Sequence, residues 1–147
     1  MSVVAGVDIR RSRDETERAA AADLRIRVFC GEQGVPRSEE FDGRDGEATH
    51  LVAVEDGMVL GTCRLLGAGD TVRLGRLAVA REARRRGIGA ALLAAGEAEA
   101  RAAGAERIVL NAQTQALGLY TAACYEAQGE PLMEAGIEHV RMERRLA

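Results

Sequence analysis

Hydrophobic and polar residues alternate, or hydrophobic residues run together, in six stretches of the chain that we predict to be β-strands. In the first stretch every second residue from Val3 to Ile9 is apolar. In the last stretch Met142 falls on the apolar side of the predicted strand, whereas His139 falls on the polar side. The stretches are residues 3–10, 50–55, 58–66, 71–79, 106–111 and 137–146.

Apolar residues at steps of three or four indicate helices over residues 14–30, 87–103 and 115–123. Asp14 followed by Glu17 is typical of a helix start, and Gly104 is typical of a helix end. Residues 31–46 combine glycines, a proline and acidic residues, so we expect a loop there with a short helical turn from Ser38. A loop of this length is usually functional.

The order of these elements predicts how they are arranged. Asp56-Gly57 is a strong signal for a two-residue hairpin, so the second, third and fourth strands should form a meander. A full helix separates residues 71–79 from residues 106–111, which favours a parallel pair joined by a right-handed crossover. We therefore predict one α/β domain over residues 1–147, whose mixed, mostly antiparallel sheet is splayed at this pair and binds its ligand at the carboxyl ends of the two strands.

Composition narrows the function classes. The chain has 147 residues, enough for one domain that buries about two thirds of its unfolded surface. Its 23 acidic and 20 basic residues are interspersed and give a net charge of -3, so we do not expect a nucleic-acid partner. Cys30, Cys63 and Cys124 have the spacing of neither a disulfide framework nor a zinc site. With no predicted leader or membrane span, we expect a soluble, cytoplasmic protein and no membrane partner.

One stretch stands out for its chemistry, between the predicted strand 71–79 and the helix that follows. Glycines at a helix start let the backbone approach a ligand, and the free amides and helix dipole favour an anion such as a diphosphate. A Walker loop is excluded because the chain has no lysine, and a dinucleotide fingerprint is excluded because Leu92 replaces its third glycine. The stretch reads Arg84-Arg85-Arg86-Gly87-Ile88-Gly89-Ala90.

The pattern Arg84-x-x-Gly87-x-Gly89 resembles the acyl-coenzyme A loop of the GNAT superfamily of N-acetyltransferases. Other motifs, in the right order over nearly the whole chain, resemble its YjcF-like bacterial branch. These motifs are Arg25-x-x-Val28-Phe29-x-x-Glu32-Gln33-x-Val35-Pro36, Glu39-Glu40-x-Asp42, His50, Leu110-Asn111-Ala112-Gln113, Leu119-Tyr120 and Ala135-Gly136-Ile137-x-His139. The resemblance implies the GNAT fold, with a six- to seven-stranded sheet, a central parallel pair and about four helices. Cys124 departs from it, because relatives have glycine there.

The resemblance also implies residue roles. Acetyl-coenzyme A is expected as cosubstrate, with no metal, on the residues Leu77, Ala78, Val79, Arg84, Arg85, Arg86, Gly87, Ile88, Gly89, Ala90 and Asn111. The backbone N–H of Val79 would bind the oxyanion. Tyr120 would be the general acid, although a tyrosine on a short helix can equally be an edge-of-core residue, as we expect for Tyr125. Gln33, His50 and His139 would contact the acceptor.

The acceptor amine must lose a proton before it attacks, because a free aliphatic amine has a pKa near 10. Glu32, Glu40 and Asp42 are the candidate bases, and we take Glu32 as the general base. Each could instead be an ordinary solvated loop carboxylate.

The sequence thus predicts acetyl transfer to a primary amine of a small molecule, by direct attack in a ternary complex, since no cysteine has an obvious activating neighbour. Two alternatives stay open: a non-catalytic acyl-coenzyme A sensor, and a protein N-acetyltransferase with an open groove. The oligomeric state is also open, a homodimer included.

Overall fold

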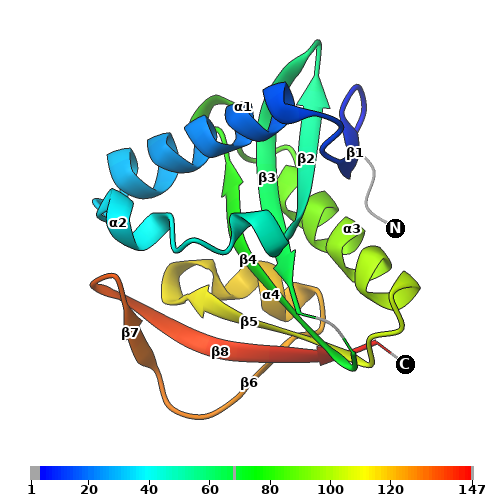
Figure 1. Ribbon diagram of the computed structural model, residues 1–147. Helices are drawn as coiled ribbons and strands as arrows, with labels where there is room; N and C mark the ends of the chain where they lie inside the picture. The colour runs from blue at the N-terminus through cyan, green and yellow to red at the C-terminus, as the bar shows by residue number, and fades with distance from the viewer. Residues whose placement is uncertain (1–3, 68, 147) are drawn as a thin grey trace.

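A twisted sheet runs through the molecule (Figure 1). The computed structural model describes residues 4–67 and 69–146. Its strands are β1 (Asp8–Arg11), β2 (Thr49–Glu55), β3 (Met58–Leu66), β4 (Thr71–Val79), β5 (Arg107–Gln113), β6 (Glu126–Ala127), β7 (Leu132–Glu134) and β8 (Ile137–Arg145). They lie in the order β1-β2-β3-β4-β5-β8-β6, with β7 paired to β8. The predicted mixed α/β fold with one parallel strand pair is confirmed.

Two details of the strand prediction were wrong. The first strand begins only at Asp8, because Gly6 has φ 78° and the N–H of Val7 closes a turn on the carbonyl of Val4 at 3.1 Å. Val3, placed in that strand from the sequence, lies outside the described residues. The short strands β6 and β7 were not predicted, because two or three residues are too few to show an alternating pattern.

The β2–β3 hairpin was predicted correctly. Glu55 pairs with Met58 across Asp56 and Gly57, whose φ angles of 50° and 76° are those of a type I′ turn.

The parallel pair β4 and β5 separates soon after it begins. Its registered pairs run only from Thr71↔Arg107 to Arg73↔Val109. Beyond this point β4 stays paired with β3 and β5 stays paired with β8, so the two strands diverge. Their facing backbone edges therefore line a wedge-shaped opening in the middle of the sheet.

A β-bulge lies in β4 beside this opening. Arg64 pairs with Gly75 but Thr62 pairs with Ala78, so β4 carries one residue more than β3 between these points. Arg76 occupies the bulge with φ 56°, a left-handed conformation that is uncommon outside glycine. Such bulges redirect nearby side chains and backbone groups.

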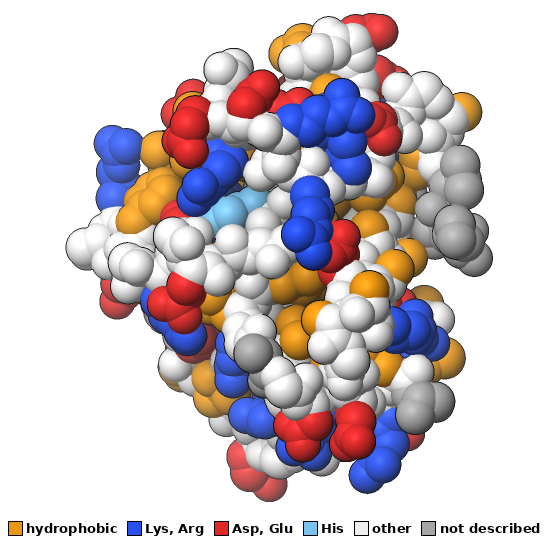
Figure 2. Space-filling view, turned by 45° about the vertical axis from the view of Figure 1, so that its right-hand side comes forward, with side chains coloured by type: hydrophobic (Ala, Val, Ile, Leu, Met, Phe, Trp, Pro, Cys, Tyr) orange, Lys and Arg blue, Asp and Glu red, His pale blue; other side chains and the backbone are white. Residues whose placement is uncertain are grey.

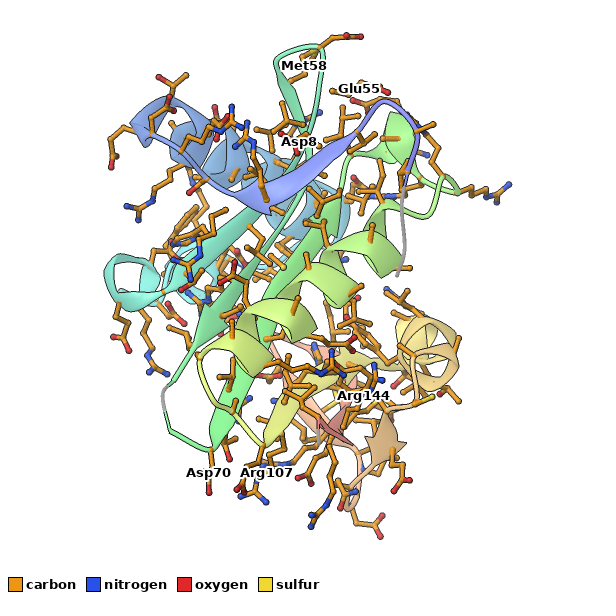
Figure 3. All side chains as sticks on the ribbon, turned by 90° about the vertical axis from the view of Figure 1, so that its right-hand side faces the viewer. Asp8, Glu55, Met58, Asp70, Arg107 and Arg144 are labelled. Carbon is orange, nitrogen blue, oxygen red and sulfur yellow. The ribbon has the colours of Figure 1, made fainter. Side chains whose placement is uncertain are left out.

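Helices cover both faces of the sheet: α1 (Glu15–Arg25) on one and α3 (Ile88–Ala102) on the other (Figures 1 and 3). The predicted cap is confirmed, because Asp14 Oδ1 accepts a hydrogen bond from the N–H of Glu17 at 2.9 Å. α2 (Arg37–Glu40) follows the expected turn from Ser38 closely, and α4 (Leu117–Ala122) is the core of the last predicted helix.

The helix expected to end at Cys30 instead continues as a π-helix, Ile26–Glu32. The N–H of Gln33 bonds the carbonyl of Val28, five residues back, at 3.2 Å. The loop therefore begins two residues later than predicted, and π-helical turns are frequent at functional sites.

Two glycines let α3 approach the sheet closely. A Cβ on Gly96 would lie 2.9 Å from Leu74 Cδ1, and one on Gly61 would lie 2.9 Å from Ile88 and from Leu92. Protein interiors are packed without spare volume, so α3 can lie this close to the sheet only if both positions are glycine.

Candidate active site

A cleft of about 1280 Å³ opens where β4 and β5 diverge. β4 contributes its length from Arg73 to Val79, and β5 contributes Leu110, Asn111 and Gln113. The end of the π-helix, the segment around α2, α4, β7 and the starts of α3 and β8 also line it, together with Arg64 and Leu66 of β3 and Arg84. Elements from distant parts of the sequence therefore converge on the carboxyl ends of the parallel pair, as the sequence predicted.

The loop before α3 lies at one end of this cleft. Gly87 is the residue before the first helical turn, and its φ of 86° is one that glycine adopts without strain. In the part of the chain that the structure describes, the backbone N–H groups of Ile88, Gly89 and Ala90 donate to no protein acceptor. A Cβ on Gly89 would lie 3.7 Å from Leu119 and 3.9 Å from Val79, two residues that line the cleft. Free donors at a helix start favour an anion such as a diphosphate.

The three arginines of the loop are not equivalent. Arg84 donates from Nε to the carbonyl of Val79 at 3.1 Å, and its Nη1 lies 2.8 Å from Glu32 Oε1. Arg86 pairs with Glu55, which Figure 3 shows at the end of the β2–β3 hairpin beside this loop. Arg85 is exposed and makes no ion pair or hydrogen bond within the described chain. Arg85 therefore has no partner within the described chain to give up to an outside anion, whereas Arg84 is the arginine of the run that lines the cleft.

Glu32 and Gln33, at the end of the π-helix, join the two sides of the wedge. Gln113 of β5 donates from Nε2 to Gln33 Oε1 at 2.7 Å, while Glu32 pairs with Arg84 beyond β4. The hydrogen bond from Arg84 lowers the pKa of Glu32, which makes this carboxylate a weaker base. The role of Glu32 as general base stays a prediction, and this contact weighs against it.

Glu40 and Asp42, the other candidate bases, belong to a cluster of charges in which Glu40 is buried and Asp42 is at the surface. Arg25 Nε donates to Glu40 Oε2 at 2.7 Å, and Arg64 Nη1 donates to Asp42 Oδ1 at 2.9 Å. We define the ion-pair network as Arg25, Glu40, Asp42, Asp45, Arg64 and Arg76.

Burial raises the pKa of Glu40, and the bond from Arg64 lowers the pKa of Asp42. Both carboxylates are already engaged by arginines, so the structure gives neither a free position as a base. Sequence analysis missed three members of the network, because they belong to no recognisable motif: Asp45, Arg64 and Arg76.

The two histidines lie in different places. His50 Nε2 is 2.8 Å from the carbonyl of Asp45, and His50 does not line the cleft. His139 does line it and is only 9% exposed, although it falls on the polar side of the strand pattern. The start of β8, where His139 lies, borders the cleft, whereas Arg141 farther along the same strand is exposed.

The two tyrosines also differ. Tyr120 lines the cleft from α4 at 7% exposure, and burial raises its pKa to about 12. Tyr125 is buried, as predicted, and its hydroxyl donates to Glu97 Oε2 at 2.9 Å, which in turn pairs with Arg144 beneath α3 (Figure 3). Cys124, between them, has φ 70°, a left-handed conformation that costs a non-glycine residue some backbone strain.

Asn111, expected to bind acetyl-coenzyme A, donates from Nδ2 to Glu134 Oε2 at 3.1 Å. Both residues line the cleft. Sequence reasoning missed Glu134, because it lies in the three-residue strand β7 and belongs to no motif.

Charged side chains, and side chains of the types that bind metals, are spread over the molecule. Figure 2 shows acidic and basic side chains interspersed on the visible face. Among the described residues, His, Cys, Asp and Glu side chains form no group of three or more able to hold a metal ion. No helix in the described ranges combines the length and apolarity needed to cross a membrane.

Comparisons with known proteins agree with this architecture. Residues 14–146 match the Acetyltransferase (GNAT) domain family. The chain is 33% identical to the uncharacterized N-acetyltransferase YjcF of Bacillus subtilis over 132 residues, covering 89% of this chain and 94% of YjcF. A solved Lactobacillus plantarum structure, provisionally assigned as an N-acetyltransferase, superposes with a TM-score of 0.88 at 29% identity, covering 97% of this chain and 99% of that one.

A GNAT family acetyltransferase from Elizabethkingia anophelis, solved with acetyl-CoA bound, shares the fold with a TM-score of 0.75 at 19% identity, over 96% of this chain and 99% of that one. Fold, cleft and comparisons together define an acyltransferase. The chain belongs to the GNAT acetyltransferase family, and the predicted resemblance to its YjcF-like branch is confirmed.

Proposed function

We propose that this protein transfers an acetyl group from acetyl-coenzyme A to the primary amine of a small molecule, by direct attack in a ternary complex. The observation that carries the proposal is the cleft between β4 and β5, with the free amides of Ile88, Gly89 and Ala90 at one end. Acetyl-coenzyme A would supply the thioester carbon that the amine attacks.

The diphosphate would bind at the start of α3, where free N–H groups and the helix dipole both favour an anion. Arg85 adds an exposed positive charge next to them. The open edges of β4 and β5 offer unpaired backbone groups to the amides of the pantetheine arm, as an added strand would use them.

The oxyanion would bind the N–H of Val79. Antiparallel strands alternate between residue pairs that exchange both hydrogen bonds and pairs that exchange none. Because the N–H of Ala80 bonds the carbonyl of Leu60 at 2.8 Å, the N–H of Val79 is directed away from β3 and toward the wedge. A fixed backbone donor in this position can stabilise developing negative charge without reorganising.

Tyr120 would assist the departing thiolate. A raised pKa keeps its hydroxyl protonated through the neutral and mildly alkaline range. A thiol has a pKa of about 8.5, so complete proton transfer from Tyr120 is uphill. The hydroxyl therefore acts chiefly as a hydrogen-bond donor to the sulfur as negative charge develops there.

The acceptor would be a small molecule, because the segment that follows the π-helix is fastened over the cleft. The ion-pair network anchors residues 40–45 to β3 and β4, and the Gln33–Gln113 bond bridges the wedge. A peptide would need an open groove in the same place.

Turnover on an amine library, followed by release of the coenzyme A thiol, tests the proposal. We expect steady-state release with at least one small primary amine and stoichiometric N-acetyl product. Binding of acetyl-coenzyme A without release on any amine would favour the sensor alternative, and release only with peptide amines would favour protein acetylation.

Tyr120→Phe tests the role of the hydroxyl. The ring and its packing are kept, so stability and acetyl-coenzyme A affinity should change little, whereas turnover should fall by about 10² to 10³ fold, as for the loss of one hydrogen-bond donor to developing charge. Tyr125→Phe is the matched control, since that hydroxyl bonds Glu97 outside the cleft and its loss should spare turnover. If Tyr120→Phe keeps more than about a tenth of parental turnover with chemistry rate-limiting, the hydroxyl has no such role.

A further inference from the structure

His139 has one ring nitrogen committed and the other available. Its Nδ1 lies 2.7 Å from the carbonyl oxygen of Ile137. A carbonyl oxygen can only accept, so Nδ1 must carry a proton. In the neutral ring the lone pair is therefore on Nε2, and within the described chain Nε2 has no hydrogen-bond partner.

A carboxylate lies near that lone pair. Glu134 Oε2 is 4.0 Å from His139 Nε2, too far for a hydrogen bond but close enough for an ion pair. Asn111 fixes this carboxylate through a 3.1 Å hydrogen bond from Nδ2. The arrangement leaves the Nε2 lone pair of a neutral His139 ring free, with a carboxylate beside it.

Four of the other titratable groups on the cleft are poorly suited to the same task. Arg84 lowers the pKa of Glu32, and Tyr120 stays protonated with a pKa of about 12. Glu40 and Asp42 are already paired with arginines of the ion-pair network. Imidazole, by contrast, exchanges a proton near neutral pH.

We propose that His139 is the general base of the reaction, with Glu134 stabilising its charged form. This inference rests on the proposed function. The acceptor ammonium gives one proton to Nε2, and its nitrogen lone pair then forms the bond to the thioester carbon. As the carbon–sulfur bond breaks, the second nitrogen proton passes to the sulfur. The products are the N-acetyl amide and free coenzyme A, and Nε2 returns its proton to solvent.

The test uses His139→Asn, because the asparagine amide can still donate to the Ile137 carbonyl while Nε2 is lost. With an alkylamine acceptor at pH 7, kcat/KM should fall by about 10² to 10³ fold, and the rate of the variant should recover with rising pH as solvent deprotonates the amine. Thermal stability and acetyl-coenzyme A affinity should match the parent. Arg141→Gln is the matched control, since Arg141 is on the same strand, exposed and outside the cleft lining.

A second acceptor separates proton removal from positioning. A hydrazide on the same carbon skeleton is already neutral at pH 7, so the defect of His139→Asn should shrink at least tenfold on it. An equal loss on both acceptors, or no loss on the alkylamine, overturns His139 as the base. If the parent protein acetylates no amine at all, the proposed function fails instead.

Discussion

The loop before α3 and the ion-pair network use the same residue type, arginine, in opposite ways. Arg84 and Arg86 of the loop keep side-chain exposures of 40% and 37%, whereas Arg25 and Arg64 of the network keep 4% and 5%. Exposed ion pairs are worth about 0 to 1 kcal/mol and can exchange partners readily. Buried pairs that lose one member leave an uncompensated charge, at a cost of about 3 to 5 kcal/mol.

This difference shows how one end of the cleft is adaptable while the other is fixed. The loop can give up its own contacts to a ligand anion at little cost. The network cannot, and its members reach from α1 through residues 40–45 to β3 and to the bulge at Arg76. Arg76 also donates to the carbonyl of Glu40 at 3.1 Å, so the network braces the strained residue of β4.

The largest expected effect comes from a substitution that blocks anion binding at the loop before α3. Gly89→Val should leave the fold intact, because a Cβ there makes only ordinary contacts, but should weaken coenzyme A binding by about two to four orders of magnitude through two lost charge-assisted hydrogen bonds. Calorimetry measures the affinity. Gly96→Val is the reciprocal control and should lower the melting temperature, because its Cβ would meet Leu74 at 2.9 Å. Unchanged affinity of the Gly89→Val variant for coenzyme A would show that the diphosphate does not bind at this loop.

Breaking the network should have the next largest effect, on stability. Arg25→Met leaves Glu40 without its closest partner and should lower the free energy of unfolding by about 3 to 5 kcal/mol in urea titrations. Arg44→Gln is the control on the neighbouring segment, where an exposed pair with Glu47 should contribute less than about 1 kcal/mol. Equal effects of the two substitutions would show that burial does not distinguish these charges.

The smallest effect sharpens the assignment within the arginine run. Arg85→Gln should weaken coenzyme A binding by about three- to tenfold and should reduce the dependence of that binding on salt. The reason is that salt screens the attraction between an exposed charge and the diphosphate. Arg86→Gln, with similar exposure but a partner in Glu55, should change the salt dependence less. The reverse order in a calorimetric salt series would mean that Arg86 leaves Glu55 to bind the phosphate.

Sequence reasoning succeeded at the helix cap, the hairpin and the glycine loop, where the decisive contacts lie within a few residues. Asp14 caps α1 through Glu17, three positions on, and Asp56-Gly57 sets its hairpin through its own φ angles. The free amides of the loop follow from Gly87 and the helix directly after it. Such features depend on backbone geometry and local hydrogen bonds, so a linear pattern predicts them.

The side of the cleft where we propose that the acceptor binds was decided only by tertiary structure. Arg25 meets Asp45 from 20 residues away, Gln33 meets Gln113 from 80, and the face on which His139 lies depends on the strands that β8 joins. The local sequence by itself determined where helices begin, where the chain turns and which backbone amides at a helix start stay without an acceptor. Which carboxylates are buried against arginines, and which nitrogen of His139 keeps a free lone pair, depends on segments that only folding brings together, since burial and long-range pairing leave no local pattern in the sequence.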